Sequence, residues 1–241
     1  MNFIRLISAL LVLAVPAGAQ DYSLDMNYAS KYVWRGSVLA QNGVFQPSFT
    51  ASMGDLSVNL WGNMDLTNEN GVTRKINEWD YTVDYSTTVS GIGISTGIIG
   101  YTFPNSSGPG TTELYLGAGL DLPGSPSLTV YEDIEAVNGT YVSLSVIYSV
   151  PIMYMTSVDI NAAVGLGSGK MNQALYAPSS GAGLADFLVN FSIPIPISDL
   201  FCVTPGVIVT SILNSEGQNA YDAIDLDSKN LVFLLTTSLT F

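Results

Sequence analysis

The chain has 241 residues, of which 47% are hydrophobic and only 11% charged, and its formal net charge is −13. After the N-terminal segment there is no run of about 18 apolar residues, which excludes a helical membrane protein. The acidic balance argues against nucleic acid as a partner. With one cysteine and no histidine, the chain has no internal disulfide and cannot build a zinc site from the usual ligands. The length suits one β-barrel as well as two small domains.

Residues 1–19 have the features of a secretory signal peptide. Arg5 supplies the positive charge, residues 6–15 form a short apolar core, and residues 17–19 (AGA) form a small-residue cleavage site. The core is too short to favour the alternative, an N-terminal transmembrane anchor. We therefore expect residues 1–19 to be removed and residues 20–241 to form one domain.

The mature chain alternates between apolar and polar residues, as strands with one apolar face do. The first predicted strand runs from Tyr22 to Arg35, and its length fits a tilted crossing of a bilayer, which needs about 9–11 residues plus interfacial ends. Further strands are predicted at 45–53, 56–65, 79–86, 92–103, 114–122, 128–134, 142–148, 158–166, 187–193, 201–209 and 231–241.

The connections between these strands differ in length in a regular way. Those after the second, fourth, sixth, eighth and tenth strands are tight, whereas the others are mostly longer and polar. Outer-membrane barrels have short turns on the periplasmic side and long loops outside. The pattern predicts an all-β fold: a single antiparallel up-and-down transmembrane β-barrel of 12 strands, with both termini periplasmic.

The last predicted strand, LVFLLTTSLTF at 231–241, ends in an aromatic residue. It resembles the closing strand of bacterial outer-membrane barrels, in which this ending is the signal that the barrel-assembly machinery reads. Phe241 is the candidate assembly signal. A soluble sandwich could also end on such a strand, and the rest of the chain favours the barrel.

Aromatic residues on the apolar face cluster near the strand ends, as expected where rings meet lipid headgroups. At the short-turn end these residues are Tyr22, Tyr85, Tyr148, Phe201 and Phe241. At the long-loop end they are Tyr32, Trp34, Phe45, Trp79, Tyr81 and Phe187. We expect the outer membrane's lipid to contact both girdles.

Charged residues on the opposite face are predicted to lie in the lumen. The proposed luminal charge cluster consists of Lys31, Arg35, Asp65, Asp80, Asp84 and Glu113, and the same face holds Asp25, Asp121, Asp159 and Asp186. Such a lining would attract cations, or its carboxylates could form hydrogen bonds inside a plugged lumen. Arg35 and Glu113 both fall near the long-loop end, where they form either a specific ion pair or a solvated pair that faces across water.

Several segments of the chain are similar to the TorF-type porin family. They are SKYVWRG at 30–36, QPS at 46–48, NLWGN at 59–63, TELY at 112–115, VYED at 130–133 and GTYV at 139–142. The likeness spans roughly residues 28–148, and Trp34 stands where phenylalanine is also common in the family. It implies a porin-like barrel in the bacterial outer membrane.

Two functions are compatible with this sequence. One is a narrow channel for small polar or cationic solutes by passive diffusion, and the other is a closed barrel whose long loops bind a surface partner. We expect no enzymatic activity, because known barrel enzymes use a histidine. No cofactor is expected either, and a calcium site at Asp222, Asp225 and Asp227 is less favoured than a solvated acidic loop.

Overall fold

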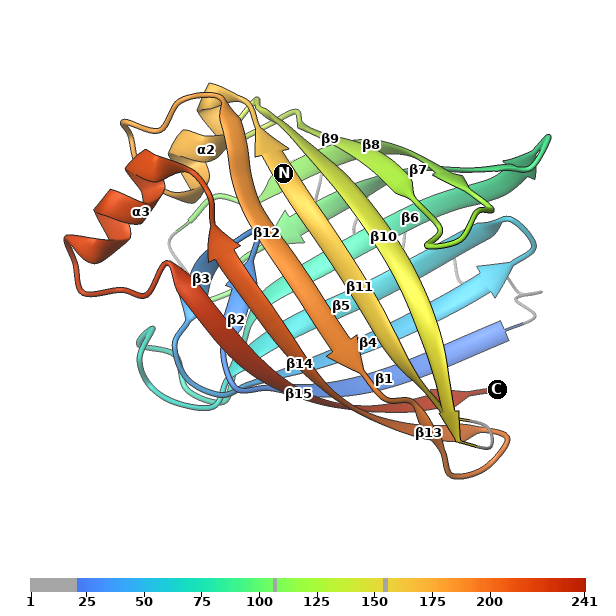
Figure 1. Cartoon of the computed structure of the whole chain (residues 1–241). Coiled ribbons are helices and arrows are strands. Elements are labelled where there is room, and N and C mark those ends of the chain that lie inside the picture. Colours follow the sequence, from blue (N-terminus) through green and yellow to red (C-terminus); the bar gives the residue numbers. More distant parts are fainter. Residues whose placement is uncertain (1–20, 106–107, 154–155) are drawn as a thin grey trace, which may run out of the picture.

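The computed structural model describes residues 21–105, 108–153 and 156–241. Within them the chain forms one β-barrel, with the longer loops and two short helices gathered at one end (Figure 1). The expected signal peptide, residues 1–19, lies outside the described residues, so its removal stays a prediction.

The barrel wall consists of twelve long antiparallel strands. They are β1 (Asp21–Ala29), β4 (Val44–Met53), β5 (Leu56–Asp65), β6 (Ile76–Val89), β7 (Ile92–Thr102), β8 (Thr111–Leu120), β9 (Ser127–Asp133), β10 (Thr140–Met153), β11 (Thr156–Gly167), β12 (Gly183–Ser192), β14 (Phe201–Ile212) and β15 (Lys229–Thr240). A two-residue strand, β13 (Ile195–Pro196), pairs with the start of β14. Each long strand pairs with the next, and β1 also pairs with β15, which closes the sheet. The predicted 12-stranded up-and-down barrel is confirmed, whereas the periplasmic position of the termini stays a prediction.

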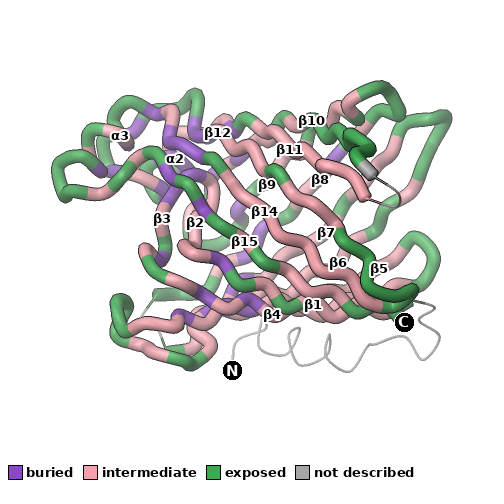
Figure 2. Tube along the Cα trace, turned by 60° about the horizontal axis from the view of Figure 1, so that its bottom comes forward, coloured by how far each residue is buried: buried purple, intermediate pink, exposed green. Residues whose placement is uncertain are grey.

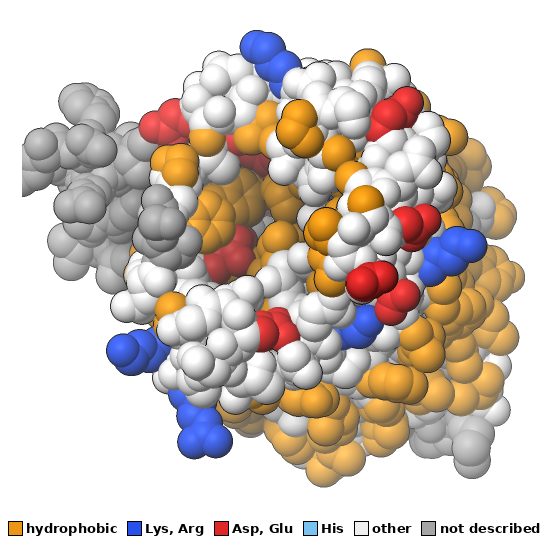
Figure 3. All heavy atoms as spheres, turned by 90° about the vertical axis from the view of Figure 1, so that its left-hand side faces the viewer, with side chains coloured by type: hydrophobic (Ala, Val, Ile, Leu, Met, Phe, Trp, Pro, Cys, Tyr) orange, Lys and Arg blue, Asp and Glu red, His pale blue; other side chains and the backbone are white. Residues whose placement is uncertain are grey.

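Each strand turns one face to the lumen and the other to the outside. On the luminal face of β1, Asn27 donates a hydrogen bond to Gln46 of β4 and accepts one from Thr236 of β15. The outer face exposes large apolar side chains, among them Leu116, Leu144, Val146, Tyr148 and Phe233. Figure 3 shows such side chains covering the visible outer wall. An apolar outer band around a polar interior is the arrangement of a barrel immersed in lipid.

The two ends of the barrel are built differently. At one end tight turns join the strands, as at Ser90–Gly91, where both φ angles are positive (53° and 80°), the conformation of the two-residue hairpin turn. At the other end the connections are longer: 30–43, 66–75, 103–110, 134–139, 168–182 and 213–228. Two of these carry the helices α2 (Gly169–Leu175) and α3 (Ser215–Asp222). The predicted sorting of loops is confirmed.

The first strand differs from the prediction, which ran it from Tyr22 to Arg35. β1 ends at Ala29, and the chain then forms a separate hairpin of β2 (Tyr32–Trp34) and β3 (Ser37–Ala40). The reversal lies at Arg35 and Gly36, whose φ angles are 48° and 77°. Because the aromatic alternation continues through the bend, it gave no sign that the strand had left the wall.

This bend also moves two residues of the predicted long-loop girdle. Tyr32 packs against Trp61 of β5 and Trp34 against Tyr101 of β7, with ring centroids 5.7 and 5.8 Å apart. Both aromatic residues therefore belong to the hairpin and its packing, and their assignment to the lipid-facing girdle was wrong.

Buried residues gather toward the long-loop end, around the hairpin and the helices (Figure 2). Two small apolar clusters lie there, one at Ala29, Ala40, Val44 and Val232 and the other at Tyr141, Met171, Leu175 and Ala185. No helix in the described part of the chain is long and apolar enough to cross a membrane.

Candidate functional site

The β2–β3 hairpin crosses the barrel at its long-loop end. One side of it reaches the strands β5 and β7 through Tyr32 and Trp34. At its tip a Cβ placed on Gly36 would lie 2.8 Å from Cβ of Asp186, on the β12 strand. A larger residue would clash with Asp186 and would also be strained at this positive φ. Glycine at position 36 therefore allows the tip to approach the wall this closely.

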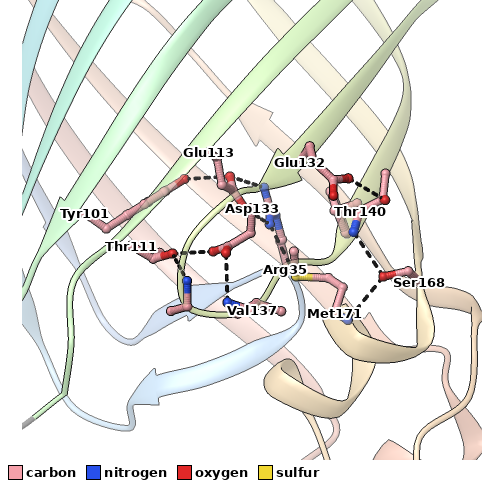
Figure 4. Close-up of polar contacts among 12 residues, drawn as sticks. Arg35, Tyr101, Thr111, Glu113, Glu132, Asp133, Val137, Thr140, Ser168 and Met171 are labelled. Atoms are coloured by element: carbon pink, nitrogen blue, oxygen red, sulfur yellow. Dashed lines mark hydrogen bonds and ion pairs between the residues drawn. The ribbon is translucent and has the colours of Figure 1, made fainter.

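Arg35, at the tip of the hairpin, forms an ion pair with Glu113 of β8. Its two terminal nitrogens donate to the two carboxylate oxygens at 2.6 and 2.8 Å, so the contact is bidentate. The side chains of Arg35 and Glu113 are only 8% and 1% exposed. Tyr101 of β7 donates a further hydrogen bond to Glu113 at 3.0 Å (Figure 4). Burial alone would lower the pKa of Arg35, but the hydrogen bonds and charge of Glu113 raise it, so this guanidinium stays charged.

Three aromatic rings surround the guanidinium of Arg35. Its central carbon lies 4.5 Å from the ring centroid of Trp34, 4.9 Å from that of Tyr131 and 4.2 Å from that of Tyr141. These distances are those of cation–π contacts, which gain strength where water is excluded. Arg35 is thus held by a carboxylate and by the faces of aromatic rings together.

The helices of the long loops hold the hairpin from the outside. Tyr176, which follows α2, donates to the carbonyl oxygen of Arg35 at 2.8 Å. The hydroxyl of Ser37 donates to the carbonyl oxygen of Leu175 at 3.0 Å and lies 2.8 Å from that of Tyr221 in α3. The hairpin is therefore bound to the wall on one side and to the loop helices on the other.

Asp133, at the end of β9, organises the neighbouring loop. Its carboxylate accepts hydrogen bonds from the backbone N–H groups of Glu135, Val137 and Asn138 and from the hydroxyl of Thr111 (Figure 4). This carboxylate is buried and fully used in fixing the loop, so its role is structural.

A polar cavity opens at the long-loop mouth beside the hairpin. It has a volume of about 490 Å³ and is lined by Tyr32, Leu39, Asn63, Asp65, Asn70, Val72, Asn77, Glu78, Phe103 and Asn105. The buried carboxylate of Asp65 accepts from the side chains of Asn63 and Asn70 at 3.0 and 2.7 Å. Seen from this end, the mouth is a hollow with acidic side chains inside it (Figure 3).

A second polar cavity, of about 450 Å³, lies at the short-turn end, where Ser86, Thr88, Ser95 and Thr129 are among the lining residues. Next to it, Asp84 of β6 accepts hydrogen bonds from Ser86, at 2.6 Å, and from the hydroxyl of Tyr115. The lumen thus has a polar cavity at each end and the hairpin near the long-loop mouth.

The structure brings together some members of the predicted luminal cluster and separates others. Arg35 meets Glu113, while Lys31 bonds to Asn230 of β15 at 2.9 Å. Asp65 lies in the mouth cavity, and Asp80 and Asp84 lie farther along β6. Lys31 and Arg35 were assigned to the first strand, which is wrong because both follow its end, but both line a cavity inside the barrel, as predicted. Asp121, also placed on the luminal face, is instead exposed in the turn after β8.

Several residues of the site were not predicted. Glu78 shares the luminal face of Asp80 but lies before the predicted start of its strand. Tyr101 and Tyr131 lie on two strands whose facing the sequence left open, because glycine and isoleucine fill one and the other is short. Tyr141 lies one residue before a predicted strand. All four are a tyrosine or an acid at the long-loop end of a strand, and this shared position is the sequence feature that could have identified them.

No protein-family model matches the chain, and no curated protein matches it in sequence. The fold is similar to that of two solved porins. The NanC porin matches with a TM-score of 0.55 and 10% identity, over 90% of this chain and 98% of its own. The KdgM porin in complex with disordered oligogalacturonate matches with a TM-score of 0.54 and 9% identity, over 91% of this chain and 99% of its own.

The chain therefore has the fold of outer-membrane porins. Together with the apolar outer wall, this similarity supports the expected location in the bacterial outer membrane. At this level of identity, the similarity identifies the fold alone and names no solute for this chain.

Proposed function

We propose that the protein is a narrow outer-membrane channel that passes small polar or cationic solutes by passive diffusion. We further propose that it is a member of the TorF-type porin family, which the segments at 30–36 and 112–115 resemble. The observation that carries the channel proposal is the row of acids on the luminal face of β6, namely Glu78, Asp80 and Asp84. Carboxylates lining a lumen of low dielectric constant attract cations and repel anions.

The balance of charge inside the barrel supports this solute class. Among the described residues Arg35 and Glu113 form the one ion pair, so the acids of β6 have no basic partner. The oxygen Oδ1 of Asp80 is buried and has no hydrogen-bond partner among the described protein groups. A carboxylate that is ionised and lines the lumen without a basic partner attracts cations.

The alternative is a closed barrel whose long loops bind a surface partner. The observation that favours it is the hairpin, which lies against β5, β7, β8 and β12 and fills part of the mouth. The polar cavities on both sides of the hairpin lead us to prefer the channel.

Single-channel recording in a planar bilayer separates the two functions. A channel gives discrete current steps when purified, folded protein is added, and heat-unfolded protein serves as the control. A silent bilayer despite correct insertion would contradict the channel and favour the closed barrel.

We expect no catalytic activity and no resident cofactor, because the sequence has no histidine and no catalytic motif. The other expected partners are the lipid of the outer membrane and the barrel-assembly machinery, which would read Phe241.

A further inference from the structure

The groups that hold the guanidinium of Arg35 are supplied mainly by the barrel wall. Glu113 comes from β8, Tyr101 from β7, Tyr131 from β9 and Tyr141 from β10, whereas Trp34 comes from the hairpin itself and the sulfur of Met171, 3.8 Å from Nη1, comes from α2. Four adjacent strands, β7 to β10, thus converge on one cation.

The arrangement has the chemistry of a receptor for a planar cation. A carboxylate that accepts two parallel N–H bonds matches the fork of a guanidinium rather than the point charge of an ammonium. Rings on Tyr131 and Tyr141 add cation–π contacts at 4.9 and 4.2 Å. The buried wall carboxylate is also fixed independently of Arg35, because Tyr101 donates to it.

Open volume adjoins Arg35 but not the four wall residues that hold it. A cavity of about 180 Å³ is lined by Lys31, which precedes the hairpin, by Arg35 and Gly36 at its tip, and by wall residues such as Trp61. Tyr32 lines both this cavity and the larger one at the mouth. A solute in this volume would therefore reach the wall residues only when the hairpin tip, with Arg35, is displaced.

We propose that the wall residues Tyr101, Glu113, Tyr131 and Tyr141 form a binding site for guanidinium groups, which the chain occupies with its own Arg35. A solute that carries a guanidinium group competes with Arg35 for this site, and the hairpin tip is released from Glu113 when the solute binds. The proposal rests on the proposed channel function, since it names the cation class that the lumen selects.

Binding is tested without any current, by thermal unfolding of the folded barrel in detergent. The probe is guanidinium chloride at low, non-denaturing concentration, compared with methylammonium chloride and sodium chloride at equal ionic strength. In Arg35→Ala the site is empty, so guanidinium should raise the unfolding midpoint by several degrees, whereas the other two salts should not. In Arg35→Ala/Glu113→Gln the shift should disappear. The matched control, Lys31→Ala, removes a base from the same loop and should show no such shift.

Each outcome bears on the proposal. Equal shifts in all variants, or no shift specific to guanidinium in Arg35→Ala, would overturn it. If Arg35→Ala does not fold, its refolding yield with and without guanidinium becomes the measurement: a several-fold rescue supports the site, and no rescue overturns it. Because the readout is binding, a silent channel with a guanidinium-specific shift would contradict the proposed conduction and leave the site intact.

Discussion

Arg35 and Glu113 form the contact on which the interior of this barrel most depends. Both side chains are almost fully buried, and the carboxylate accepts from Arg35 and Tyr101 at once. Removing one partner of a buried pair leaves the other charge without compensation, which costs about 3–5 kcal/mol, while removing both costs less.

A double-mutant cycle measures this coupling. We expect Arg35→Gln and Glu113→Gln each to lower the free energy of unfolding by about 3–5 kcal/mol. The double variant should be clearly more stable than the sum of the two single effects implies. Urea unfolding in detergent, followed by tryptophan fluorescence, gives the three values. Strict additivity would mean that the two residues do not act as a pair.

Lys31 offers the contrasting case on the same loop. Its charged ammonium donates a hydrogen bond to the side-chain oxygen of Asn230, and a hydrogen bond to a charged group contributes roughly 1.5–3 kcal/mol. Lys31→Met should therefore cost less stability than Arg35→Gln in the same unfolding experiment. A cost as large as that of Arg35→Gln would show that the charge, and not the bidentate contact, holds the hairpin.

The contact between Arg35 and Glu113 shows which parts of the site the sequence can predict. The period-two pattern placed Glu113 on the luminal face and put Arg35 at the same end of the barrel. It could not supply the aromatic rings, because Tyr131 and Tyr101 lie on strands whose alternation is weak. The contact itself joins residues 78 positions apart, and no local pattern fixes such a distance.

Among the elements, the β2–β3 hairpin has the greatest consequence for the lumen. Its sequence, YVWRGSVLA, alternates like a wall strand, so local propensity supports either a longer β1 or a separate hairpin. Arg35–Gly36 provides the turn, and the burial of Trp34 against Tyr101 decides between the two. Tertiary packing therefore overrode the strand pattern at this one place.

Removing the hairpin should widen the lumen. We expect replacement of residues 32–40 by a short glycine–serine link to raise single-channel conductance several-fold, because the hairpin crosses the mouth between β7 and β12. Lys31→Ala, which changes charge but keeps the hairpin, is the control. An unchanged conductance in the shortened protein would place the narrowest point elsewhere.

The closing strand β15 leads to Phe241, the candidate assembly signal, at the seam of the barrel. Phe241 stacks on Tyr22 at 5.7 Å, and the two residues exchange backbone hydrogen bonds across the seam between β1 and β15. An aromatic pair adds about 0.5–1.5 kcal/mol, too little to decide whether a barrel survives once formed.

Deleting Phe241 should therefore act mainly on assembly. We expect the amount of folded barrel in the membrane to fall several-fold, while the protein that does assemble unfolds at nearly the same temperature. Ile224→Ser, at an equally exposed apolar residue in the α3 loop, is the matched control. Normal membrane levels after the deletion would show that Phe241 closes the seam without serving as a signal.

At the scale of the whole molecule, the fold could be predicted almost completely from the sequence. Twelve alternating segments and loops of two lengths specify a closed antiparallel barrel, because no other architecture buries one face of every strand and leaves no free edge. The interior was less predictable, since it depends on which loop folds inward. The net result is an acid-lined lumen with a cationic hairpin tip near its long-loop mouth.

The most direct test of this account is the reversal potential of the purified protein in a planar bilayer under a salt gradient. The acids of β6 predict a reversal potential displaced toward the value for cations, and Asp80→Asn/Asp84→Asn should reduce that displacement. A reversal potential on the anion side, or one that the double substitution leaves unchanged, would contradict a cation-conducting lumen.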